Sequence, residues 1–199
     1  MIAGGKYTTY RVMAADAVDA AARGLGGDVP PSCTDDIPLL GAEGYTALWN
    51  ARHRMAREAG LTPERVERLL HRYGSRIHDL LALMRQRPEL GGPLVGAEDY
   101  LAAEAFYAVS HEGALHLDDV LTRRLHASIE TEDRGVTAAE QAAGLMAEVL
   151  GWDPATTAGE VARYRDRVEA ERVSQQQPDD ASADAARRGV RDPRLLAGE

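Results

Sequence analysis

The chain has 199 residues and a formal net charge of −9, and this acidic balance argues against non-specific binding to nucleic acid, which relies on many basic contacts to phosphate. Cys33 is the only cysteine, which excludes an internal disulfide and a cysteine-based metal cluster. No apolar run approaches the ~18 residues needed to span a bilayer, so we expect any membrane contact to be peripheral.

Hydrophobic residues make up 44% of the sequence, but aromatic residues make up only 5%, with Phe106 as the single phenylalanine. Alanine and leucine must therefore fill the core, and both residues favour helices. Together with the apolar spacing described below, this composition predicts an all-α fold, a compact bundle of about six or more amphipathic helices.

Residues 2–11 read IAGGKYTTYR. Ile2 and Ala3 resemble the end of a buried strand, and the two glycines that follow let the backbone approach a ligand closely. The turn leads into a helix whose free N–H groups and positive dipole end attract anions, and Lys6, the only lysine, adds a full positive charge. The stretch predicts a loop suited to a phosphate or a reduced flavin, although it also fits an ordinary helix start beside an incidental lysine.

This stretch leads into a first predicted helix that ends at the glycines of residues 24–27. Residues 28–42 contain three prolines, so we expect an ordered connector there. A second helix is predicted over about 42–58.

Two further helices are predicted before residue 90. The first begins with Thr62 as its N-cap and Pro63 in its first turn, and its predicted core residues are Val66, Leu69 and Leu70. The second ends at Pro88, and its predicted core residues are Ile77, Leu80, Leu81 and Met84.

In the second half, residues 97–111 are predicted to form a helix. The next segment has a helical stripe of apolar residues, Leu117, Val120, Leu121 and Leu125. Its charged residues are assigned to helix capping and ion pairs, with an interdomain contact as the alternative role: Asp118, Asp119, Arg123 and Arg124. Capping-box patterns predict two more helix starts, Thr137 with Glu140 and Thr157 with Glu160. No alternating strand pattern is present after the first three residues, and the polar composition from Ser174 onward predicts disorder.

The sequence bears on two further kinds of site, a metal centre and an anion-binding face. The six histidines form no HExxH pair, and Gly113 interrupts the nearest group, at 111–118, so the sequence predicts no metal site. Residues 51–87 contain nine arginines and four acidic residues, a local charge of +5 by subtraction. The alternative function is therefore an independent helical module that binds an anionic partner through this segment, although ordinary solvated helix faces have the same pattern.

Three stretches in order resemble the FAD-dependent glycerol-3-phosphate dehydrogenases. AGGKYTTYRVMA is similar to the sequence that closes the FAD-binding part of this family and leads into its C-terminal helical domain. Residues 103–130 resemble that domain's Tyr-x-Val-x-x-Glu-x-Ala and Asp-Asp-Val-Leu-x-Arg-Arg pattern, and residues 133–153 continue it. The resemblance covers about residues 2–172.

The resemblance implies that the whole enzyme oxidises sn-glycerol 3-phosphate to dihydroxyacetone phosphate, with FAD as cofactor and a quinone or oxygen as the final electron acceptor. It places five residues at the flavin edge near the substrate phosphate: Gly4, Gly5, Lys6, Tyr7 and Thr8. Lys6 would also bind the substrate by neutralising its phosphate. The lone Cys33 fits a reducing cytosol, so we expect a cytoplasmic location. A quinone acceptor would require peripheral contact with the inner face of the cytoplasmic membrane.

The same resemblance predicts a remnant of the FAD-binding loop at 1–9 and a C-terminal helical domain at 10–173, and the polar composition predicts a disordered tail at 174–199. The family's GxGxxG motif, its FAD-binding sheet and most of its substrate pocket are not in this chain. We therefore expect the general base to lie outside it, and the chain by itself to have no catalytic residues, no bound FAD and no activity. Its expected partner is the enzyme's own FAD-binding domain.

Overall fold

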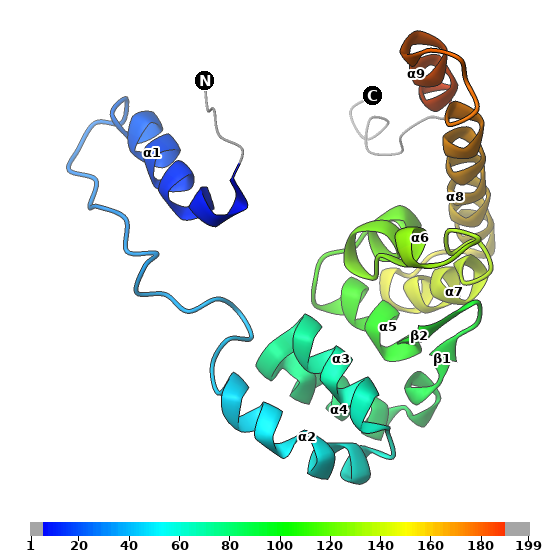
Figure 1. Cartoon of the computed structure of the whole chain (residues 1–199), viewed down its shortest axis with the longest axis horizontal. Helices are drawn as coiled ribbons and strands as arrows, with labels where there is room; N and C mark the ends of the chain where they lie inside the picture. The colour runs from blue at the N-terminus through cyan, green and yellow to red at the C-terminus, as the bar shows by residue number, and fades with distance from the viewer. Residues whose placement is uncertain (1–5, 190–199) are drawn as a thin grey trace. The chain divides into compact units, whose positions relative to one another are not determined.

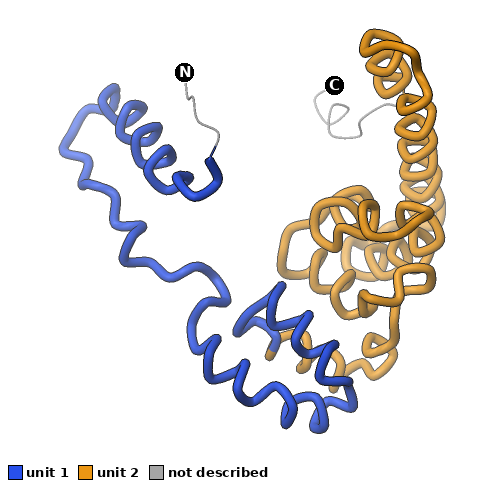
Figure 2. Tube along the Cα trace, in the orientation of Figure 1, with its two compact units in different colours: residues 1–77 blue, residues 78–199 orange. Residues whose placement is uncertain are grey.

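The structure is a computed structural model, and it describes residues 6–189 (Figure 1). Within this range it contains nine α-helices and one small two-stranded sheet, which confirms the all-α prediction. The structure divides into two compact units, residues 1–77 and 78–199 (Figure 2). The domain limits predicted from the sequence, 1–9, 10–173 and 174–199, stay a prediction.

Unit 1 begins with a short 3-10 turn, η1 (Tyr7–Thr9), that continues into α1 (Tyr10–Ala22). A long connector without helix or strand leads to α2 (Tyr45–Ala59), α3 (Pro63–Tyr73) and η2 (Gly74–Arg76) (Figure 1). Thr62 caps α3 by accepting a hydrogen bond from Arg65 N, as predicted. The core of the unit comes from α2 and α3, with Met55, Ala56, Val66, Leu69, Leu70 and Tyr73 buried.

The end of the connector approaches η2 closely. Ser75 N donates to the Gly41 carbonyl at 2.9 Å, and both Gly41 and Gly74 have positive φ angles, 88° and 54°. A Cβ atom at Gly74 would lie 2.0 Å from the Gly41 carbonyl oxygen. Glycine is therefore required at Gly74 both for its backbone conformation and for this close approach.

Unit 2 contains most of the remaining elements. Helix α4 (Ile77–Gln86) starts at the unit boundary and is followed by η3 (Pro88–Gly91) and the hairpin of β1 (Pro93–Leu94) and β2 (Ala97–Leu101). Then come α5 (Ala102–Ser110), a π-helical segment η4 (Asp119–Arg124), α6 (Ala127–Glu130), α7 (Ala139–Leu150), α8 (Pro154–Ser174) and α9 (Asp180–Arg188). The predicted stripe is fully buried in this core: Leu117, Val120, Leu121 and Leu125.

The predicted helix at 97–111 is wrong for its first five residues, which form strand β2. Gly96, at φ 77°, closes the turn of the hairpin, and a glycine at this position permits the left-handed conformation. The buried carboxylate of Glu104 accepts a hydrogen bond from Leu101 N at 2.8 Å, so the helix starts only at Ala102. Tertiary burial of Tyr100 and Leu101 thus overrides the helical pattern.

Both predicted capping boxes differ from the structure. Thr137 lies outside α7, and its N–H donates to Asp133 at 2.7 Å. Helix α8 starts earlier than predicted, because Asp153 caps it by accepting from Thr156 N at 2.6 Å. Glu160 therefore lies inside α8 and is buried.

The structure also differs from the prediction of disorder from Ser174 onward. Residues 180–188 form α9, which Asp179 caps by accepting from Ser182 N at 2.8 Å. Alanines fill much of this helix and two arginines lie in its last turn, which favours it locally. The remainder of the predicted tail, from residue 190, lies outside the described residues.

Candidate functional site

The predicted flavin loop is described from Lys6 onward, since Gly4 and Gly5 lie outside the described residues. Lys6 has an extended backbone, and the next three residues form the turn that continues into α1. The Lys6 carbonyl accepts hydrogen bonds from Thr9 N at 3.1 Å and from Thr9 Oγ1 at 2.9 Å. The loop therefore leads directly into a helix, which is the local geometry that the sequence indicates.

Lys6, Tyr7 and Thr8 are all exposed. The side chains of Lys6 and Thr9 do not cap η1 or α1. An anion at this helix start would meet the lysine charge and the positive dipole end without displacing a capping side chain. These residues thus fit an anionic group, and their role in binding flavin or substrate stays a prediction.

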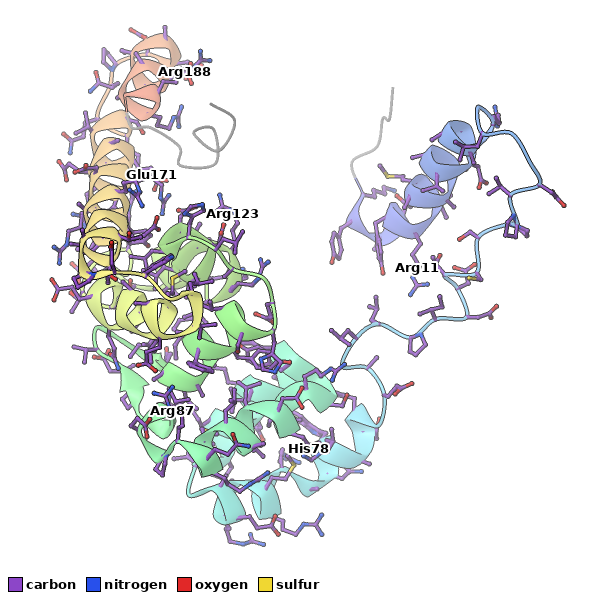
Figure 3. The ribbon with its side chains drawn as sticks, turned by 180° about the vertical axis from the view of Figure 1, so that it is seen from behind. Arg11, His78, Arg87, Arg123, Glu171 and Arg188 are labelled. Carbon is purple, nitrogen blue, oxygen red and sulfur yellow. The ribbon has the colours of Figure 1, made fainter. Side chains whose placement is uncertain are left out.

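Arg11 joins the first turn of α1 to the connector. Its guanidinium donates to the carbonyl of Thr34 and to that of Ile37, the latter at 3.3 Å, and lies 3.9 Å from the Asp35 carboxylate. Figure 3 shows the Arg11 side chain extending from the helix toward the connector. This contact links two segments of unit 1 that are more than twenty residues apart in sequence.

In unit 2, two carboxylates hold the loop before the π-helical segment. Asp119 accepts hydrogen bonds from Leu115 N at 3.2 Å and His116 N at 3.1 Å. Glu160, from α8, accepts from Leu117 N at 2.9 Å and contacts His116 Nδ1 at 3.1 Å. Three successive backbone N–H groups are therefore held by carboxylates from two different elements.

Glu160 is the buried ionisable residue of this cluster, with its side chain only 5% exposed. Burial raises the pKa of its carboxyl, but hydrogen bonds from Leu117 N, Arg163 and His116 outweigh that effect and leave the pKa below its ordinary value. Glu160 therefore stays ionised at neutral pH and stabilises the loop as a charged acceptor.

A second set of ion pairs connects η4, α8 and the loop before α7: Asp118, Arg123, Arg134, Arg167 and Glu171. Arg167 Nη2 also donates a hydrogen bond to Thr122 Oγ1 at 2.9 Å. Asp118 pairs with Arg123 and, at 2.6 Å, with Arg167 Nε. Arg167 also pairs with Glu171, which lies 3.2 Å from Arg134 Nη1. Arg123 and Glu171 are both labelled in Figure 3.

These contacts confirm that the charged residues of the DDVLTRR stretch serve in capping and ion pairing. Arg124, the second of the two arginines that end this stretch, donates a hydrogen bond to the Glu112 carbonyl at 2.9 Å. The contribution of Glu160 was missed, because its spacing from Thr157 also fits a capping box. The Asp153-Pro154 pair, an N-cap followed by proline, was the signal that could have placed the helix start correctly.

The segment proposed for an anionic partner contains several arginines that are paired with acids. Arg52 Nε lies 2.5 Å from Glu67, and Arg54 lies 3.7 Å from Glu58. Arg87 lies 2.7 Å from both Glu89 and Glu148. This pairing reduces the positive charge that the segment could offer to a partner.

Among residues 6–189, no group of three or more histidine, cysteine or acidic side chains has the arrangement of a metal site. Over the same range, no helix combines the length and apolar character needed to cross a membrane.

Comparison with known proteins identifies the class of domain. The family described as the C-terminal domain of alpha-glycerophosphate oxidase matches residues 32–157, and the chain belongs to this family. Its relatives are glycerol-3-phosphate dehydrogenases, which supports the dehydrogenase interpretation over the anion-binding module.

The chain is 54% identical to glycerol-3-phosphate dehydrogenase 2 of Mycobacterium tuberculosis over 186 residues, 94% of this chain and 32% of the relative. It is 30% identical to the glycerol-3-phosphate dehydrogenase of Synechocystis, over 83% of this chain and 30% of the relative. It is also 30% identical to the mitochondrial enzyme SDP6 of Arabidopsis thaliana, over 84% of this chain and 29% of the relative. The chain thus spans about a third of the length of these relatives, and no solved structure was found to match it.

Proposed function

We propose that this chain is the C-terminal helical part of an FAD-dependent glycerol-3-phosphate dehydrogenase. The observation that carries the proposal is the 54% identity to a mycobacterial glycerol-3-phosphate dehydrogenase over 94% of the chain. The whole enzyme oxidises sn-glycerol 3-phosphate to dihydroxyacetone phosphate, and the C-terminal part alone is inactive. FAD, when bound, supplies the acceptor for the hydride that leaves carbon 2 of the substrate.

Within this proposal, Gly4, Gly5, Lys6, Tyr7 and Thr8 lie at the flavin edge. The supporting observations are the exposed Lys6 and a loop that leads into α1 without a capping side chain from Lys6 or Thr9. Lys6 would neutralise the substrate phosphate, and positive charge near the flavin would stabilise its anionic reduced form. A difference of about 1.4 kcal/mol between the two flavin states shifts a two-electron potential by roughly 30 mV.

The proposed location of the enzyme is the cytoplasm, with electrons passing to a quinone or to oxygen. A quinone acceptor would place the enzyme in peripheral contact with the inner face of the cytoplasmic membrane. Reduction of a quinone carried in vesicles, compared with oxygen consumption in solution, distinguishes the two acceptors. Sedimentation of the whole enzyme with the same vesicles tests the membrane contact.

The test uses a chimaera in which this chain replaces the matching third of the M. tuberculosis relative. We expect the chimaera to bind flavin and to reduce an artificial dye when glycerol 3-phosphate is added. A well-folded chimaera that holds flavin but does not oxidise glycerol 3-phosphate would contradict the proposal.

Lys6 is tested in the same chimaera. We expect Lys6→Met to raise KM for glycerol 3-phosphate about 10-fold or more, because one phosphate contact of roughly 1.5–3 kcal/mol is lost, and to lower the flavin potential. Arg23→Met removes a positive charge from an exposed residue just after α1 and serves as the matched control. Equal effects of the two substitutions would show that Lys6 acts only through its contribution to the net charge and not through a direct contact with the substrate phosphate.

A further inference from the structure

Helix α1 and the connector after it expose an unusual amount of apolar surface. No residue of α1 is buried. Of the thirteen large apolar side chains that are exposed in the described residues, nine lie between residues 7 and 40: Tyr7, Tyr10, Val12, Val18, Leu25, Val29, Ile37, Leu39 and Leu40. Exposed apolar side chains that share one face of a helix are typical of an interaction site.

One face of α1 is suited to packing. Tyr10, Ala14, Ala17, Val18 and Ala21 have the spacing i, i+4, i+7, i+8 and i+11, which places them on one side of the helix, and we call this the Tyr10 face. Tyr10 is 41% exposed and Val18 is 64% exposed. The carboxylates Asp16 and Asp19 lie on the opposite side.

A helix of 13 residues is marginal in water unless an apolar face is packed against a partner. The match to the C-terminal domain family begins at residue 32, after α1 has ended. The relatives are about three times as long as this chain. Helix α1 also follows the predicted flavin loop without interruption.

Resting on the function proposed above, we infer that α1 is an element of the FAD-binding part of the enzyme rather than of the C-terminal domain. Its Tyr10 face docks on the polypeptide that precedes this region in the longer relatives. The connector at 23–44, held to α1 through Arg11, then carries the chain from the FAD-binding part to the α2–α3 hairpin. Docking of α1 would also fix the position of Lys6, four residues before Tyr10.

Hydrogen–deuterium exchange of the α1 amides tests this inference. In the chain by itself we expect these amides to exchange at close to the rate of an isolated helix, and in the chimaera to be protected at least about 100-fold more. Protection in the isolated chain that equals that of the chimaera, or that rises with concentration as in self-association, would overturn the inference. Unprotected α1 amides in a chimaera that is folded and active would also overturn it.

A matched pair of variants locates the contact. Ala17→Arg introduces a large charged side chain on the Tyr10 face, and Asp16→Arg introduces the same side chain on the opposite side. We expect Ala17→Arg to reduce the protection of α1 in the chimaera at least about 10-fold, and Asp16→Arg to leave it within about twofold. Equal effects of the two variants would show that the Tyr10 face is not the contact.

Dye reduction by the chimaera separates this inference from the proposed function. Strong protection of α1 without oxidation of glycerol 3-phosphate would support docking and contradict the function. Oxidation of glycerol 3-phosphate without protection of α1 would support the function and contradict docking. If Ala17→Arg prevents folding, the comparison between the isolated chain and the unmodified chimaera still decides the inference.

Discussion

Removal of the Glu160 carboxylate should destabilise unit 2 more than any change at an exposed acid of the same helix. Glu160→Ala leaves the buried Leu117 N–H without its acceptor at 2.9 Å, which costs about 1–3 kcal/mol, and removes the contacts with His116 and Arg163. We expect the free energy of unfolding to fall by about 3 kcal/mol. Glu160→Gln should lose only about 1–2 kcal/mol, because an amide oxygen can still accept from Leu117 N.

The assay is urea and thermal unfolding followed by circular dichroism. A loss of about 3 kcal/mol corresponds to a fall in Tm of about 6–12 °C for a chain of this size. Glu169→Ala, at an exposed position of α8, is the control and should change stability by less than about 0.5 kcal/mol. A Glu160→Ala variant that is as stable as Glu169→Ala would refute the role assigned to the carboxylate.

The lowered pKa of Glu160 gives this residue a pH signature. Because the folded-state pKa lies below the ordinary value of 4.5, the unfolded chain binds more protons in that range, and stability rises with pH. The stabilisation by the ionised Glu160 carboxylate is complete above about pH 4.5 and is lost as the pH falls through the folded-state pKa of this group. We expect the difference in unfolding free energy between the wild type and Glu160→Gln to shrink in acid, and a constant difference down to pH 3 would contradict the assignment.

Two other substitutions test the packing and the buried polar groups. Gly74→Ala should lower the free energy of unfolding by about 2–4 kcal/mol, because its Cβ would lie 2.0 Å from the Gly41 carbonyl oxygen. The control is Gly60→Ala, at φ 67° with open space around it, which should lose only about 1 kcal/mol. Equal losses would show that the close approach of Gly74 to Gly41 is unimportant. Tyr164→Phe leaves the Arg134 carbonyl without its hydrogen bond at 2.6 Å and should lose about 1–2 kcal/mol in chemical unfolding at pH 7. Burial raises the pKa of Tyr164 to about 12 from 10.0, so the contribution of its hydroxyl to the free energy of unfolding is full below pH 10 and falls toward pH 12. This fall should occur in the wild type only. The same fall in Tyr164→Phe would argue against the burial effect.

The sequence by itself was sufficient for features that depend on neighbouring residues. Thr62 as the N-cap and Pro63 in the first turn define the start of α3, because capping is a contact between residues three apart. The apolar stripe at 117–125 predicted burial correctly, since residues spaced by one turn share a side of any helical segment, even one that is locally π-helical. Three motifs in order also indicate the family, because each motif is a run of adjacent residues that can be recognised without knowing what it contacts.

Tertiary structure decided the features that depend on residues far apart in the chain. Residues 97–101 have a helical pattern but pair with Pro93 and Leu94, and the buried Glu104 delays the start of α5. Glu160 fits a local capping box, yet it accepts hydrogen bonds from a loop more than forty residues away. The free energy of a buried carboxylate depends on the donors that surround it, and only the folded chain brings those donors together.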